Sequence, residues 1–126
     1  MDAGTIYNTW PLMGSNYFPD DNNIINLLSL SAFNDASLVQ FLHRNLAYLI
    51  IIVYFFIFFK IYRNNYKILY KPINLIGFFL IIQIILGILT LLSGAQIYLA
   101  SMHQISSIFL ISACIYFLYL NKQVSN

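Results

Sequence analysis

Hydrophobic residues gather into three long runs, and a more polar segment precedes them. The runs cover residues 38–59, 73–92 and 97–120, each about as long as the roughly 20 residues that a helix needs to cross the hydrocarbon core of a bilayer. Strands of a membrane barrel are shorter and alternate between apolar and polar positions, and these runs do not alternate. The pattern therefore predicts an all-α membrane protein with three transmembrane helices, at about 38–60, 72–93 and 97–120.

The composition agrees with a membrane protein and excludes several other classes. Of the 126 residues, 60% are hydrophobic and 8% are charged, whereas about a quarter of the residues in a soluble domain are charged. The formal net charge is +2, which leaves no broad basic surface for nucleic acid phosphates, so we exclude nucleic acid as a partner. The single cysteine, Cys114, lies within an apolar run and permits neither an intrachain disulfide nor a cysteine-based zinc site.

The distribution of charge predicts how the helices cross the membrane. The connection 60–71 carries four basic residues and no acid, which is typical of a cytoplasmic loop. The uncharged link 93–96 is short and predicts an antiparallel hairpin that turns on the outer side. Residues 1–37 hold all four acids and no Lys or Arg, so we expect an external loop segment there, followed by a three-helix membrane domain at 38–126. No export signal precedes that loop, so we expect the sequence to be part of a longer protein with a further helix upstream.

Two histidines lie at matching depths in the predicted spans. His43 lies five residues beyond Leu38 and His103 five beyond Tyr98, near the outer starts of their helices, which places both about 8 Å below the outer boundary. Their helices are parallel in this topology, so the two imidazoles can face each other, as six-coordinate ligation of a haem iron requires. Zinc would need a third or fourth ligand that the spans do not offer. The simpler alternative for each histidine is an interfacial residue that bonds to a carbonyl or to water.

Polar neighbours of the histidines extend the candidate site. Arg44 either reaches the outer headgroups or pairs with a haem propionate, which must also lie near the polar boundary. Gln40 and Gln104 either orient the imidazoles or propionates or simply contact water. Small and polar residues also form a stripe on the second helix, and such a face either packs closely against another helix or leaves room for a flat macrocycle. The members of this stripe are Gln83, Gly87, Thr90 and Gly94.

These motifs resemble those of one protein family over nearly the whole chain. Residues 2–14 (DAGTIYNTWPLMG) and 18–21 (FPDD) are similar to the external loop of the haem A synthases of alphaproteobacteria and mitochondria. Residues 39–44 (VQFLHR) resemble the histidine motif that opens a helix in that family. Gln83 with residues 86–92 (LGILTLL), followed by residues 99–104 (LASMHQ), resembles its last two helices. The sequence is therefore similar to the haem A synthases in both the order and the spacing of its motifs.

The resemblance implies a function beyond what the spacing indicates. Haem A synthases oxidise a methyl group of haem O to the formyl group of haem A for the biogenesis of cytochrome c oxidase. They are membrane proteins of two similar four-helix halves, one of which receives haem O and carries a catalytic carboxylate, whereas the C-terminal half binds haem b through two histidines. The resemblance implies that this sequence is the C-terminal half only, that its helices form part of a four-helix haem-binding bundle, and that His43 and His103 are the axial ligands.

The resemblance also implies partners and a location. The substrate half has no counterpart here, and the sequence contains no Glu, so we do not expect the chain to convert haem O alone. Its expected partners are the missing N-terminal half, haem O through that half, haem O synthase, and further copies in an oligomer. The expected location is the bacterial inner (plasma) membrane, with the mitochondrial inner membrane as the alternative. A non-enzymatic bis-His haem b module for electron transfer or assembly, and a nonfunctional remnant, remain as alternative interpretations.

Overall fold

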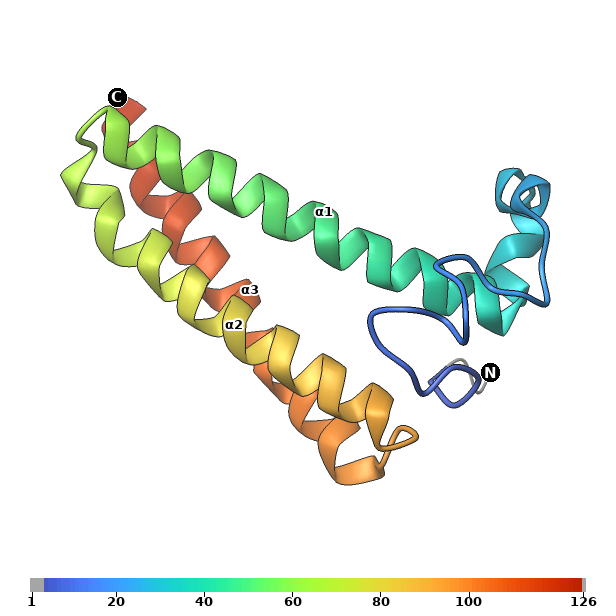
Figure 1. Ribbon diagram of the computed structural model, residues 1–126. Helices are drawn as coiled ribbons and strands as arrows, with labels where there is room; N and C mark the ends of the chain where they lie inside the picture. The colour runs from blue at the N-terminus through green and yellow to red at the C-terminus, as the bar shows by residue number, and fades with distance from the viewer. Residues whose placement is uncertain (1–3, 126) are drawn as a thin grey trace.

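A computed structural model describes residues 4–125, with side chains described for 4–123, and this part of the chain is helical apart from its N-terminal loop (Figure 1). Three helices are long and apolar enough to cross a membrane, which confirms the predicted fold class. They are α1 (Ala36–Arg63), α2 (Tyr70–Leu92) and α3 (Ile97–Ser125). Three short 3-10 helices complete the order: η1 (Ile24–Leu28) and η2 (Leu30–Asn34) before α1, and η3 (Lys67–Leu69) before α2.

The first spanning helix, α1, begins directly after its N-cap residue, Asp35. Asp35 has an extended backbone, and its side chain accepts a hydrogen bond of 3.0 Å from the backbone N–H of Leu38, which would otherwise lack a partner. Hydrogen bonds from the Asn22 side chain and from this N–H lower the pKa of Asp35. At the other end, Lys60 and Arg63 lie in the last turn, where positive charge is favourable beside the unpaired carbonyls.

The second and third helices form a tight antiparallel hairpin. Gly94 and Ala95 both have positive φ angles, of 69° and 58°, which reverse the chain between the helices. The backbone N–H of Ala95 donates to the carbonyl of Thr90 at 2.8 Å, so the turn satisfies part of the end of α2. Figure 1 shows α2 and α3 side by side along their length. The hairpin is therefore the most closely packed part of the bundle.

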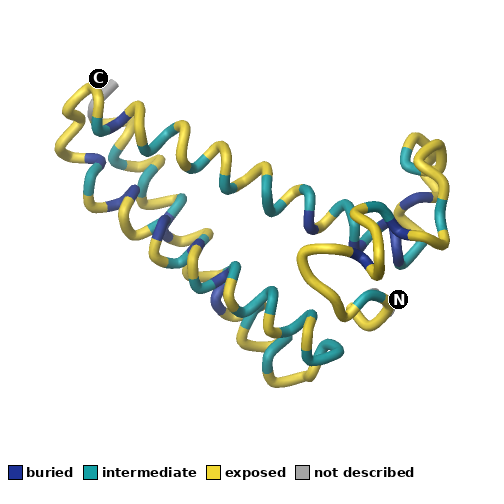
Figure 2. Tube along the Cα trace, in the orientation of Figure 1, coloured by how far each residue is buried: buried dark blue, intermediate teal, exposed yellow. Residues whose placement is uncertain are grey.

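The first helix contacts the hairpin mainly near its own C-terminal end. A cluster of buried residues lies there, formed by Ile61, Leu69 and Ile73. Tyr54 of α1 also packs onto Gly77 of α2, where an added Cβ would overlap the tyrosine hydroxyl. Towards its N-terminus α1 diverges from the hairpin, and the N-terminal loop lies at that end (Figures 1 and 2).

Most of the helix surface is exposed within the chain. Between 6% and 11% of the residues in the most apolar window of each spanning helix are buried. Figure 2 shows that the buried positions gather on the facing sides of the helices and around the loop. The apolar outer surface fits helices that face lipid or further helices.

The sidedness of the helices is a prediction that labelling can test. In a Cys114→Ser background, Asn26→Cys in the N-terminal segment should react with a membrane-impermeant thiol reagent added from outside, because that segment is predicted to be external. Asn64→Cys at the end of α1 should react only after the membrane is opened. Both residues are exposed, so the reactivity of each position depends on which side of the membrane it faces. Labelling of position 64 from outside would contradict the predicted topology.

Candidate functional site

The two histidines lie together at the end of the molecule where α1 diverges. His43 from α1 and His103 from α3 are each about two turns from the start of their helices. Their ring centroids are 6.4 Å apart and the ring planes meet at 80°. His43 is exposed and His103 is half-buried. The structure therefore brings together, from two different helices, the two residues that the sequence indicates as ligands.

The spacing of the rings fits one metal ion between them. An imidazole nitrogen binds a metal at about 2 Å and lies roughly 1 Å from its ring centre, so two imidazoles on opposite sides of one ion have centres about 6 Å apart. The observed 6.4 Å matches this value. Among the residues that the structure describes, no three His, Cys, Asp or Glu side chains gather into a metal site. Two imidazoles therefore meet here without a third such side chain, and a haem iron would need only two protein ligands because its macrocycle supplies the others.

The second helix holds His103 in place through backbone and steric contacts. A Cβ added at Gly87 would lie 3.2 Å from Cε1 of His103, so the ring packs directly over a glycine. The amide of Gln83 donates to the carbonyl oxygen of His103 at 3.1 Å, and the hydroxyl of Ser106 donates to the same oxygen at 3.0 Å. These contacts fix both the backbone of His103 and the space that its ring occupies.

Two buried polar atoms near this contact lack partners among the described residues. They are Nδ1 of His103 and Oε1 of Gln83. A buried polar atom without a partner is costly, so it identifies a place where a bound group or a small rearrangement would add an interaction. Nδ1 of His103 and Oε1 of Gln83 therefore each have unused capacity to bind a further group.

Arg44 and Gln40 bind the N-terminal loop rather than pointing into open space. The guanidinium of Arg44, 9% exposed, donates to the carbonyls of Thr9 at 2.9 Å, Leu12 at 3.1 Å and Tyr7 at 3.1 Å. The amide of Gln40 donates to the same Tyr7 carbonyl at 3.1 Å. Charge-assisted bonds of this kind are stronger than neutral ones. The two side chains therefore fasten the loop to the N-terminal part of α1.

The loop also reaches the turn between α2 and α3. A Cβ added at Gly4 would lie 3.1 Å from the Cβ of Ala95, and one added at Gly94 would lie 3.6 Å from the Asn8 amide nitrogen. The loop thus connects the end of α1 with the end of the hairpin, on the same side of the molecule as the histidines.

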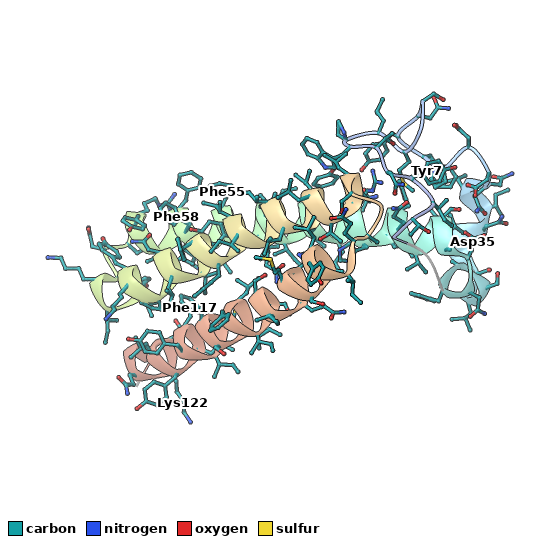
Figure 3. All side chains as sticks on the ribbon, turned by 90° about the horizontal axis from the view of Figure 1, so that it is seen from below. Tyr7, Asp35, Phe55, Phe58, Phe117 and Lys122 are labelled. Atoms are coloured by element: carbon teal, nitrogen blue, oxygen red, sulfur yellow. The ribbon has the colours of Figure 1, made fainter. Side chains whose placement is uncertain are left out.

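Tyr7 also holds the loop through a hydrogen bond of its side chain to Asp21. Its hydroxyl donates to the Asp21 carboxylate at 3.0 Å, and Ser37 of α1 donates to the other oxygen of that carboxylate. Burial raises the pKa of Tyr7, and the hydrogen bond to Asp21 raises it further. Figure 3 shows Tyr7 at the same end of the molecule as Asp35, opposite Lys122. Several side chains therefore hold the loop against the N-terminal part of α1.

The remaining predicted residue lies apart from these contacts. Gln104 is exposed, and its backbone carbonyl accepts from Ser107. The contacts of Gln83 and Gly87 with His103 were not assigned from the sequence, which placed both residues only on a shared stripe. The roles of Arg44, Gln40 and Gln104 towards a haem stay predictions.

Comparison with known proteins identifies the family. The family model described as cytochrome oxidase assembly protein matches residues 1–115. The chain belongs to this family. Proteins named "Heme A synthase" are similar along almost the whole chain, which confirms the resemblance drawn from the sequence: that of Pelagibacter ubique is 38% identical over 122 residues, 97% of this chain and 36% of the relative.

Further relatives give the same picture. The Wolbachia pipientis wMel protein is 39% identical over 127 residues, 100% of this chain and 35% of its own length. The Flavobacterium johnsoniae protein is 37% identical over 122 residues, 94% of this chain and 36% of its own length. The chain therefore spans about a third of the length of the curated relatives that it matches. No solved structure matches the chain.

The loop contacts of Arg44 lead to a test. Arg44→Gln should lower the free energy of unfolding by about 2 kcal/mol, because it removes charge-assisted hydrogen bonds to three backbone carbonyl groups. Amide hydrogen exchange in residues 7–14 should accelerate at the same time. Arg63→Gln, at the exposed end of the same helix, is the matched control and should leave exchange in the loop unchanged. Unaltered exchange in the Arg44 variant would contradict the fastening role.

Proposed function

We propose that this chain forms the haem b-binding, C-terminal half of a haem A synthase, with His43 and His103 as the axial ligands of the haem iron. The observation that carries the proposal is the pair of imidazoles, from two spanning helices, with centroids 6.4 Å apart. Membership of the cytochrome oxidase assembly protein family and the names of the relatives support it.

Each side chain of the site has a distinct part in this proposal. His43 and His103 hold the iron, and Gly87 leaves the space that the His103 ring needs. Gln83 fixes the backbone of His103 by its hydrogen bond to the carbonyl. Arg44, next to His43 in the sequence, fastens the N-terminal loop to α1 near the pair. When bound, a haem with two histidine ligands supplies electron transfer or structural support, because both axial positions are filled.

The whole reaction needs more than this chain. The proposed activity of the longer protein is oxidation of the haem O methyl group to the formyl group of haem A. We place the haem O site in the remaining two thirds of the protein, in the N-terminal half, and propose haem O synthase as the source of the substrate. The proposed location is the bacterial inner membrane, as a multi-pass protein.

A second candidate is a non-enzymatic haem b module that carries electrons or assembles with a partner. The same histidine pair favours it, because two ligands from one chain leave no open axial position for substrate or oxygen. The two candidates share the haem site and differ in whether haem A is made.

Pigment extraction from a host that makes haem O but lacks its own synthase separates them. We expect no haem A with this chain alone, and haem A when the chain is co-expressed with the N-terminal portion of the Pelagibacter relative. The intact relative is the positive control. Absence of haem A in the co-expressing strain, while the intact relative produces it, would contradict the synthase function and favour the module. Haem A from the chain alone would contradict the division of the reaction between two halves.

A further inference from the structure

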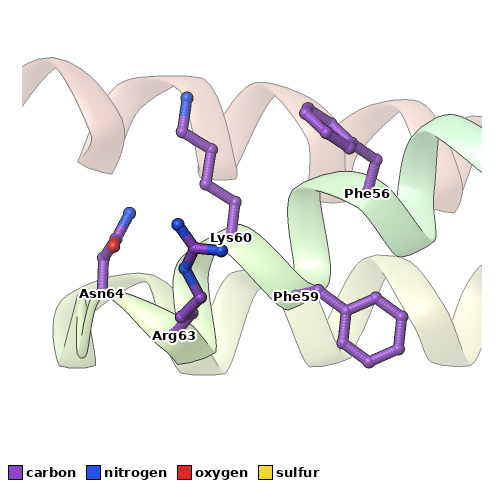
Figure 4. A pocket seen from close by; sticks show the side chains of 5 residues that line it. All are labelled: Phe56, Phe59, Lys60, Arg63 and Asn64. Carbon is purple, nitrogen blue, oxygen red and sulfur yellow. The ribbon is translucent and has the colours of Figure 1, made fainter.

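Two adjoining cavities lie at the opposite end of the bundle from the histidines. The first, of about 330 Å³, is lined by Phe56, Phe59, Lys60, Arg63 and Asn64 at the end of α1 (Figure 4). The second, of about 510 Å³, lies between α1, η3 and α3, and Phe56 and Lys60 line both cavities. Because they share these two lining residues, the two cavities are neighbours, and we treat them as one candidate site with a basic part and an apolar part.

The basic part lacks a counter-charge within the described chain. Lys60 and Arg63 are three residues apart, on the same face of the helix, and both are exposed. In Figure 4 the guanidinium of Arg63 lies nearer to the side chain of Asn64 than the ammonium of Lys60 does. The described acids all precede α1, and Asp35 lies at the opposite end of the molecule from Lys122 (Figure 3). Two like charges that neighbour each other repel, so this part favours an anion.

The apolar part has the shape of a groove between two spanning helices. Ile57 and Ile61 of α1 line one side, and Phe117 of α3 lines the other. Phe56 joins this groove to the basic part. Free phosphate or another small anion would use only the charged part, whereas a molecule with a hydrocarbon tail would use both.

We propose that this site binds one anionic phospholipid, with its phosphate at Lys60 and Arg63 and an acyl chain along Phe56 and Phe117. The site lies where a membrane-spanning helix ends, which is the level of the lipid phosphates. Basic pockets between spanning helices recognise anionic headgroups by charge, and the groove adds contact with the hydrocarbon tail. The site uses none of the residues that surround the histidines.

Binding of a fluorescent phosphatidylglycerol to the purified chain in neutral detergent tests the proposal. We expect clearly tighter binding than for the phosphatidylcholine analogue. Lys60→Gln/Arg63→Gln should weaken phosphatidylglycerol binding about 30-fold, since each basic residue contributes to headgroup attraction. The matched control, Lys67→Gln/Lys71→Gln, removes the same charge from the same end but outside both cavities, and should weaken it less than about threefold.

Three further readings complete the experiment. Phe56→Ala should weaken binding, whereas the neighbouring Phe55→Ala, outside both cavities, should not. Circular dichroism should show the same helix content in every variant as in the wild type, so that the affinities of folded proteins are compared. Equal losses in the two double variants would show a diffuse surface charge and overturn the proposal. Equal affinity for both lipids, or displacement of the lipid by inorganic phosphate alone, would overturn it as well.

Discussion

Replacing His103 by Ala is expected to reduce the haem retained by the purified chain by more than about tenfold, since loss of a partner that merely orients a ligand already costs that much. His43→Ala should have the same effect, because each imidazole supplies one of the two axial bonds. The haem-to-protein ratio of the purified protein measures this directly. The side chain of neither histidine makes a hydrogen bond among the described residues, so removing it should leave the helices intact.

Met102→Ala is the matched control for the histidine variants. Met102 precedes His103 directly and is exposed, so its replacement should leave the haem content close to that of the wild type. Circular dichroism should show equal helix content in all the variants. Unchanged haem content in both histidine variants would contradict the assignment of His43 and His103 as axial ligands. An equal loss of haem in the control variant would show that any substitution in this turn of α3 disrupts haem binding. That result would also contradict a specific role for the histidines.

Gly87→Val is the second change with a large expected effect on haem binding. A Cβ at this position already lies 3.2 Å from Cε1 of His103, and the two γ-methyl groups of valine need still more of the space that the ring fills. The ring must then move away from its present position. We expect a loss of haem of about tenfold or more, comparable to the loss of an orienting partner. The haem-to-protein ratio is again the measurement.

Two companion variants give this prediction its controls. Gly87→Ala requires a shift of only a few tenths of an ångström and should retain most of the haem. Leu89→Val introduces the same β-branched residue into the same turn of α2, on the exposed face, and should bind haem like the wild type. Wild-type haem content in Gly87→Val would contradict the placement of the His103 ring over Gly87 in the haem-bound protein.

The fold class and the proximity of the two histidines could be predicted from the sequence. The predictions rest on the lengths of the hydrophobic runs and on the number of residues between each helix start and its histidine. Run lengths alone indicate three spans, because the bilayer fixes the number of residues that a helix needs. The depth of His43 and His103 follows from counting residues from each helix start, and the structure places their rings 6.4 Å apart. Both inferences rest on regular helix geometry, which a sequence specifies well.

The contacts of the N-terminal loop could not be predicted in the same way. Arg44 donates to the carbonyls of Tyr7, Thr9 and Leu12, which precede it by 32 to 37 residues. Every residue has a backbone carbonyl group, so the sequence does not show which of these groups accept hydrogen bonds from a side chain. The hydrogen bond from Gln83 to the carbonyl of His103 was unpredictable for the same reason.

Glycine positions show a related limit. Gly77 and Gly87 both lie on α2, and each allows a close approach by another element. The structure sets Tyr54 of α1 against Gly77 and His103 of α3 against Gly87. Periodicity assigns a glycine to a helix face, but the neighbour that uses the space depends on how far α1 diverges from the hairpin. That divergence is a tertiary property, which no local pattern encodes.

Carbon monoxide binding to the ferrous haem of the purified chain tests the central claim most directly. A haem held by both His43 and His103 has no open axial position, so we expect a low-spin, six-coordinate spectrum that carbon monoxide leaves unchanged. The His43→Ala variant, reconstituted with excess haem, should bind carbon monoxide because one position is then open. A wild-type chain whose haem binds carbon monoxide as readily as that variant would contradict axial ligation by the two histidines.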